Sequence, residues 1–210
     1  MAYGYLGQNT PNQTVNNSGV FSITDSANLQ SQGKLGGSLE LIEEKSISSV
    51  SSTIFTDIKE NVYDVHYLTI ENYVATSDGL ALKCRFFENG VEESASVYQF
   101  ANQYGSTGGA GFAESKSTGA TEFSLTTSTG NQAHEIGNSY LYFYNLGNSS
   151  KYSFNTLQTT SIRLDGSYIM MFGGGVLPQA SLVDQIKVFV TSGTFSATAK
   201  LYGVKQIWVT

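Results

Sequence analysis

Beyond residue 37, the chain consists largely of short runs in which apolar and polar residues alternate with a period of two. Over residues 82–86 the apolar side chains fall on one side, while Lys83 and Arg85 fall on the other. Residues 140–144 and 186–190 repeat the alternation. This is the pattern of a half-buried β-strand, because successive side chains of a strand point to opposite faces. No amphipathic helix of useful length is predicted.

Turn signals separate these runs. The strongest are Glu88-Asn89-Gly90 and Asp165-Gly166, because Asn-Gly and Asp-Gly dipeptides favour tight hairpins. Leu146-Gly147-Asn148 and Thr191-Ser192-Gly193 mark two further turns. Many short strands joined by tight turns predict an all-β fold, namely an antiparallel, jelly-roll-like β-sandwich with an extended N-terminal arm.

Residues 1–37 differ in character from the rest of the chain. Residues 8–19 are polar, uncharged and rich in turn formers, so they cannot build a core of their own. We therefore divide the chain into an N-terminal arm over residues 1–37 and a β-sandwich domain over residues 38–210. A chain of this length buries about 70% of the surface that its unfolded state exposes, so the sandwich needs no metal or disulfide to fold.

Composition narrows the range of partners. Only 13% of the residues are charged, whereas the chain holds 22 Gly, 13 Tyr and 12 Phe. Depletion of charge and enrichment in aromatic residues are typical of the cores of protein interfaces. The net charge of -6 gives no general attraction to nucleic acid, and no nucleic-acid partner is expected. No apolar run approaches the ~20 residues that span a bilayer, so no membrane insertion is expected.

Residues that could carry chemistry are few. His66, His134 and Cys84 cannot complete a zinc shell, and the sequence has no calcium loop, nucleophile elbow or phosphate-binding loop. Asp64 and His66 would share one face of a strand, but a strand histidine that is exposed or makes a single hydrogen bond is the interpretation we favour. Cys84 alternates with apolar residues and is predicted to be buried. We predict no catalytic, cofactor-binding or metal-binding residue, and no enzyme.

Three glycine-rich segments stand out from the strand pattern. Gly173-Gly174-Gly175 follows an apolar strand and predicts either a β-bulge or a close approach of another backbone. Residues 103–111 and 126–132 are rich in Gly, Ser and Thr and are predicted to be irregular loops. Loops tolerate variation in binding more readily than strands do.

The order of several segments resembles a β-sandwich module of tailed-bacteriophage virion proteins, over roughly residues 38 to 207. The segments are Leu39–Ser49, which begins Leu-Glu-Leu-Ile, then Phe55–Ile58, Tyr63–Ile70, Leu80–Gly90 and Leu201–Gly203. The resemblance implies a non-enzymatic structural protein at the virion surface, a tail fibre or other appendage component. It further implies self-association, and we expect a homotrimer.

The arm resembles the start of phage appendage proteins through Gly7-Gln8, which precedes a proline, and through Gly19-Val20-Phe21-Ser22. It is therefore expected to dock on other virion proteins. The residues expected to anchor it are Tyr3, Tyr5, Leu6, Val20, Phe21 and Ile23. The alternative is a terminus without fixed structure, as chain ends often are.

Two other functions remain open. One is a receptor-binding module that recognises a host surface polysaccharide through its loops; the other is a capsid decoration or head-fibre protein. Sugars stack on aromatic rings, and Tyr104, which we place in a loop, is our candidate for a residue that contacts a glycan. Tyrosines on strands pack across the sheet or fill interfaces more often than they bind sugars.

Overall fold

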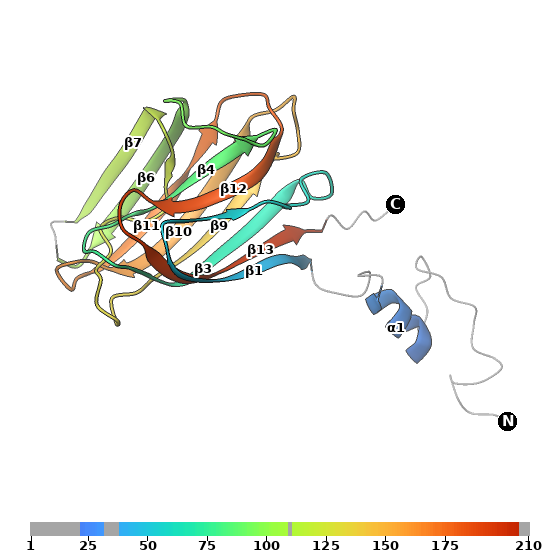
Figure 1. The fold of residues 1–210 in the computed structure, drawn as a ribbon, viewed down its shortest axis with the longest axis horizontal. Helices are drawn as coiled ribbons and strands as arrows, with labels where there is room; N and C mark the ends of the chain where they lie inside the picture. The colour runs from blue at the N-terminus through green and yellow to red at the C-terminus, as the bar shows by residue number, and fades with distance from the viewer. Residues whose placement is uncertain (1–21, 32–37, 109–110, 206–210) are drawn as a thin grey trace. The chain divides into compact units, whose positions relative to one another are not determined.

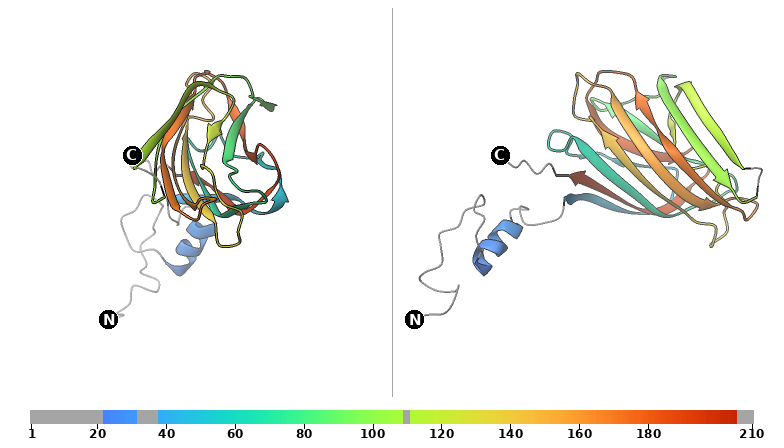
Figure 2. Two further views of the ribbon diagram at one scale, coloured as in Figure 1. Left: turned by 90° about the vertical axis from the view of Figure 1, so that its left-hand side faces the viewer. Right: turned by 180° about the vertical axis from the view of Figure 1, so that it is seen from behind.

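The computed structural model describes residues 22–31, 38–108 and 111–205. The chain divides near Leu39 into two units, which we describe separately. The unit that begins at Glu40 consists of strands in two sheets that pack face to face (Figures 1 and 2). The predicted antiparallel β-sandwich is confirmed.

Within the described ranges, the larger sheet has eight strands and the smaller has five. The larger sheet has the order β1 (Leu39–Val50), β13 (Phe195–Val204), β3 (Val65–Ala75), β9 (Gly137–Tyr144), β10 (Ser153–Ile162), β11 (Tyr168–Leu177), β6 (Tyr98–Ser106) and β7 (Phe112–Ala120). The smaller sheet has the order β2 (Ser52–Phe55), β12 (Val183–Val190), β4 (Leu82–Glu88) and β5 (Val91–Glu92), and β8 (Phe123–Ser124) pairs with β4.

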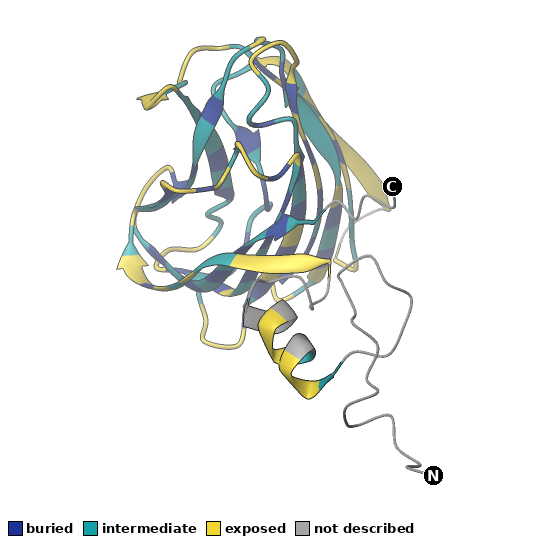
Figure 3. Cartoon of the chain, turned by 90° about the vertical axis from the view of Figure 1, so that its right-hand side faces the viewer, coloured by how far each residue is buried: buried dark blue, intermediate teal, exposed yellow. Residues whose placement is uncertain are grey.

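The alternation in the sequence becomes alternation in burial. Along β9, Leu141 and Phe143 are fully buried, whereas the three tyrosines that alternate with them reach the surface. Figure 3 shows the same stripes along neighbouring strands of the larger sheet. The core between the sheets contains an aromatic cluster in which the Phe86 ring lies 5.4 Å from that of Phe123 and 5.6 Å from that of Phe143, measured between centroids. Cys84 is fully buried among these apolar residues, as predicted.

The two strongest turn signals are confirmed. Asn89 and Gly90 both have positive φ angles, 50° and 79°, and join β4 to β5. A two-residue hairpin turn with both central residues in this region is the type that suits the twist of the flanking strands. Gly166 has φ 75° in the turn between β10 and β11.

The triple glycine allows a close approach of backbones, which was one of its two predicted roles. Gly173–Gly175 lies inside β11, and β11 pairs with both β10 and β6 without a register shift, so the predicted bulge is wrong. A Cβ added at Gly175 would lie 2.6 Å from the carbonyl oxygen of Gln99 and 2.6 Å from the ring of Phe123. The glycines therefore set how closely the three strands and the core ring can pack.

The other unit contains one described element, the nine-residue helix α1 (Ile23–Ser31). For these residues the predicted extended arm is wrong. The helix begins with a bond from the backbone N–H of Ser26 to the carbonyl of Ser22, 2.9 Å long. Such local bonds need no apolar stripe, and the sequence Ile-Thr-Asp-Ser-Ala-Asn-Leu-Gln-Ser has little apolar periodicity from which a helix could be predicted.

Candidate functional site

Tyrosines gather on the outer face of the larger sheet. Tyr140, Tyr142 and Tyr144 point outward from β9, while the residues between them point into the core. Tyr67 of β3 stands opposite Tyr142, with ring centroids 4.8 Å apart. Tyr202 of β13 stands opposite Tyr67, with ring centroids 6.0 Å apart. The sheet register thus joins tyrosines from distant parts of the chain into one row.

The next strands extend this surface with further aromatic and amide side chains. Phe154 of β10 and Phe172 of β11 are 42% and 39% exposed, high fractions for phenylalanine. Gln158 of β10 accepts a hydrogen bond of 2.6 Å from the hydroxyl of Tyr140, which fixes both side chains. We call the outward face of β13, β3, β9, β10, β11 and β6 the tyrosine face.

The centre of the tyrosine face carries no charge. The described strands β9, β10, β11 and β6 place only uncharged residues on this side. Charged pairs lie at its margins instead. On one side Lys200 of β13 lies 3.8 Å from Glu71 of β3, and on the other Lys116 lies 2.7 Å from Glu114, both on β7. An uncharged aromatic centre within a charged margin is the anatomy of a protein interface.

Two adjoining hollows, of about 580 and 310 Å³, lie beside this centre, where β11, β6 and β7 meet. Ala101 and Lys116 line both hollows. Gly174 lines the larger hollow and Gly173 the smaller. Because glycine has no side chain, the triple glycine that brings the strands close also leaves a depression in the surface. The hollows leave room beside the centre of the tyrosine face for side chains of another molecule.

The outer face of the smaller sheet has the opposite character. Arg85 of β4 binds Glu92 at 2.9 Å and Glu122 at 3.0 Å, and Lys187 of β12 binds Glu92 at 2.8 Å. Burial by itself raises the pKa of Glu92, but the hydrogen bonds from Lys187 and Arg85 outweigh burial and lower the pKa below its usual value. The guanidinium of Arg85 also lies 4.8 Å from the ring centre of Phe189. These charges satisfy one another within the chain.

The residues considered for catalysis do not form a site. His66 is fully buried, and its Nε2 lies 2.7 Å from the carbonyl oxygen of Ile58, to which it donates. Loss of hydration lowers the pKa of His66. His134 is exposed in a different part of the domain. Among the described residues, no three His, Cys, Asp or Glu side chains are grouped as metal ligands would be, and no helix is long and apolar enough to cross a membrane.

Ile23 is the one predicted anchoring residue that the structure describes. It begins α1, and 79% of its side chain is exposed. The remaining predicted anchors lie outside the described residues: Tyr3, Tyr5, Leu6, Val20 and Phe21. Their proposed role in docking stays a prediction.

Tyr104 does not lie in a loop, so this part of the sequence interpretation is wrong. It belongs to β6 and stands opposite Met171, whose side chain is buried. Tyr104 therefore points toward the space between the sheets and packs partly against the core. The alternation Gln-Phe-Ala-Asn-Gln-Tyr continues the strand into the glycine-rich segment, and this was the signal that the composition of residues 103–111 obscured.

The tyrosine face itself was not identified as a site from the sequence. Alternation over Tyr140–Tyr144 gave the direction of three tyrosines, but the pairing of β9 with β3 and β10 could not be read from it.

In comparisons with known proteins, no family model matches the chain, and neither a curated protein nor a solved structure matches it.

Proposed function

We propose that this chain is a non-enzymatic structural protein of a tailed-bacteriophage virion, a tail fibre or appendage component docked by its arm. Its tyrosine face packs against copies of the same chain in a homotrimer. The observation that carries the assembly role is the uncharged aromatic centre of the tyrosine face between charged margins. Burying such a surface removes apolar area from water without stripping ions of their hydration.

The size of the tyrosine face suits a stable interface. Six strands spaced about 4.8 Å apart, of eight to eleven residues each at about 3.3 Å per residue, give roughly 29 by 26–36 Å, or about 750–1,050 Å². A standard-size interface buries ~800 Å² on each partner. The whole face therefore has the area that one partner surface requires.

The setting on a phage particle is supported by the segments from Leu39 to Gly203 that resemble virion β-sandwich modules, together with the sandwich fold itself. The arm enters the sandwich at Glu40, whose carboxylate lies 2.8 Å from Lys205 at the end of the last strand. The first and last strands of the described sandwich therefore meet at this point. That placement suits a domain tethered at one end and displayed at the other.

Purified phage particles test the virion setting. Cryo-EM of intact particles, with mass spectrometry of their proteins, should locate the chain on the tail or the capsid. A variant lacking residues 1–37 should fold but fail to be incorporated. Absence of the chain from purified particles would refute the virion setting, and normal incorporation of the shortened chain would refute the docking role of the arm.

Assembly is tested by adding charge to the tyrosine face without changing side-chain shape. In Gln158→Glu the carboxylate still accepts the bond from Tyr140, so the monomer should keep its fold. In a trimer the new charge is buried without a partner, and the dissociation constant should rise at least ~tenfold. Light scattering across a range of protein concentrations measures the effect.

Gln185→Glu is the matched control, because Gln185 lies on β12 in the other sheet, opposite Phe87 of β4. The same change in charge there should leave the mass of the assembly unaltered. If the unaltered protein stays a monomer at every concentration, or both variants behave alike, the tyrosine face is not a self-association surface.

A further inference from the structure

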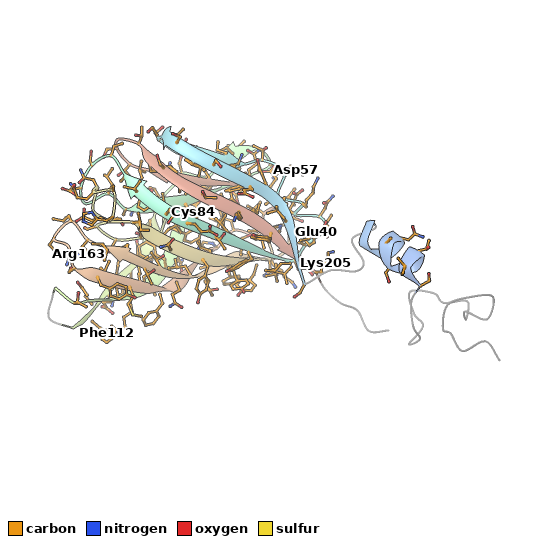
Figure 4. All side chains as sticks on the ribbon, turned by 90° about the horizontal axis from the view of Figure 1, so that it is seen from below. Glu40, Asp57, Cys84, Phe112, Arg163 and Lys205 are labelled. Atoms are coloured by element: carbon orange, nitrogen blue, oxygen red, sulfur yellow. The ribbon has the colours of Figure 1, made fainter. Side chains whose placement is uncertain are left out.

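A second kind of hollow lies between the two sheets. It has a volume of about 410 Å³ and is walled by β6 and β11 on one side and by the segment after β8 on the other. Arg163, which lines it, lies at the end of the sandwich opposite Glu40 and Lys205 (Figure 4). This intersheet pocket therefore lies far from the point where the arm enters the domain.

The fold brings together here the two segments whose Gly, Ser and Thr content stood out in the sequence. Residues 103–111 contribute Tyr104, and residues 126–132 contribute Thr126, Thr127 and Ser128. They are separated along the chain by all of β7 and β8. Nothing in the local sequence of either segment indicates that they share a pocket.

Hydroxyl groups dominate the polar lining of the intersheet pocket. Thr126 accepts a bond of 2.8 Å from the backbone N–H of Leu82, so its hydroxyl is held in place by the chain itself. The Oγ1 of Thr127 is different: it is buried and has no hydrogen-bond partner. Because this oxygen is closed to solvent, a ligand can bond it only if the Thr127 side chain rotates toward the pocket, and the new bond then offsets the cost of the unpaired hydroxyl.

Arg163 is the only charged residue among those that line the intersheet pocket. Its nearest carboxylate, Asp165, is 3.6 Å away, longer than a good hydrogen bond. Asp165 also accepts bonds from the backbone N–H and the hydroxyl of Ser167, at 3.1 and 2.5 Å. The guanidinium therefore has donors to spare, and its planar fork matches a carboxylate.

Part of the remaining lining is apolar. Ile169 and Met171 of β11 lie on the side of the larger sheet with the ring of Tyr104, and Ala81 directly precedes β4 of the smaller sheet. A surface of this kind suits the C–H face of a sugar ring, while the hydroxyls and Arg163 suit its polar edge. The volume is within the range of small-molecule sites, which is about 300–1,000 Å³.

The polar wall is fixed before any ligand arrives. Thr129 bridges to Leu80 on one side and to Arg163 on the other. The hydroxyl of Thr129 donates to the carbonyl of Thr127 at 3.1 Å, and the N–H of Gly130 donates to Ile162 at 2.9 Å. Binding does not have to order this segment first, which favours affinity.

We propose that the intersheet pocket binds a carboxylate-bearing sugar, a hexuronate unit of an acidic polysaccharide. Arg163 pairs with the carboxylate, Thr127 and its neighbouring hydroxyls bond the sugar hydroxyls, and Tyr104 covers the apolar face of the ring. The binding does not depend on the virion setting or on the trimer, since all these groups belong to one chain.

Glucuronic acid and glucose form a matched pair of probes, because they differ only in the carboxylate at C6. Isothermal titration of the full chain at neutral pH should show glucuronate binding at least ~tenfold more tightly than glucose, the ratio expected for one charge-assisted bond. Arg163→Gln should abolish that preference. Lys151→Gln, which removes the same charge from an exposed site outside the pocket, should leave it intact.

Thr127→Val separates binding from stability. The valine keeps the shape of threonine and removes a hydroxyl that has no partner in the chain, so the melting temperature should not fall. Affinity for glucuronate should drop by about twofold to tenfold. Equal affinity for the two sugars, an unchanged preference in Arg163→Gln, or no saturable binding of glucuronate would overturn the proposal. None of these results bears on where the protein sits in a particle.

Discussion

At the scale of single residues, the acidic and basic side chains that the structure describes reach the surface with few exceptions. His66 is the clearest one, since a titratable ring is fully buried with one nitrogen bonded to Ile58 and the other unpaired. Its surroundings include the ring of Tyr63, 6.1 Å away, and the more distant charge of Asp64. Burial outweighs that charge and favours the neutral ring.

Stability should therefore fall as the solution becomes mildly acidic. The pKa of His66 is lowered in the folded state, so the unfolded chain takes up a proton first, near its ordinary pKa of about 6.5. The contribution of the neutral His66 ring to the free energy of unfolding is complete above that pH. It is lost as pH falls toward the folded pKa, and the free energy of unfolding then changes by at most ~1.4 kcal/mol per pH unit. Urea unfolding between pH 8 and 5 measures it. His66→Gln should flatten this slope, and identical slopes in the two proteins would contradict the assignment.

Gly175 shows how one missing side chain controls packing. In Gly175→Ala the new methyl group meets a backbone carbonyl and the ring of Phe123, which is itself fixed 4.8 Å from the ring of Tyr98. Neither neighbour can move freely, so we expect a loss of about 1–3 kcal/mol in the free energy of unfolding. Gly119→Ala is the control, because its nearest atom is 3.4 Å away. Equal stability of the two variants would show that the strands around Gly175 can adjust.

At the scale of elements, the strands of the larger sheet differ in how they are held. β9 and β10 bury every second residue and pair on both sides. β7 has no fully buried residue, and in the described part of the sheet it pairs only with β6. The sequence of β7, Phe-Ala-Glu-Ser-Lys-Ser-Thr, alternates only weakly between apolar and polar residues. This fits a strand that has no fully buried face.

Hydrogen exchange should reveal this difference. Amide protons of β7 should exchange much faster than those of β9 and β10, because opening β7 exposes little apolar surface and breaks one ladder of bonds. Mass spectrometry of the exchanging full chain, resolved by peptide, gives the comparison. Protection in β7 equal to that in β10 would mean that another surface covers it in solution, and dilution would then be expected to remove the protection.

At the scale of the whole molecule, the two outer faces have opposite chemistry. The smaller sheet carries an ion-pair network around Arg85 that is complete within the chain, whereas the centre of the tyrosine face is uncharged. The ends of the sandwich differ too, with the entry of the arm at Glu40 and the intersheet pocket beside Arg163 at the opposite end. The assembly, tethering and ligand binding that we propose would therefore occupy three separate regions.

The sequence by itself determined the inward and outward residues of the clearly alternating strands and the two strongest turns, because alternation and Asn-Gly or Asp-Gly dipeptides act over a few neighbouring residues. It placed Tyr104 in a loop, because the glycine-rich composition of residues 103–111 obscured the end of β6. It did not determine α1, whose bonds are local but whose residues have no apolar stripe. Only the tertiary structure decided which strands are neighbours. The row from Tyr202 through Tyr67 to Tyr142, and the meeting of Tyr104 with Thr127 and Arg163, both depend on pairing between segments far apart in the chain. Such pairing is set by the packing of the complete core, and no local pattern encodes it.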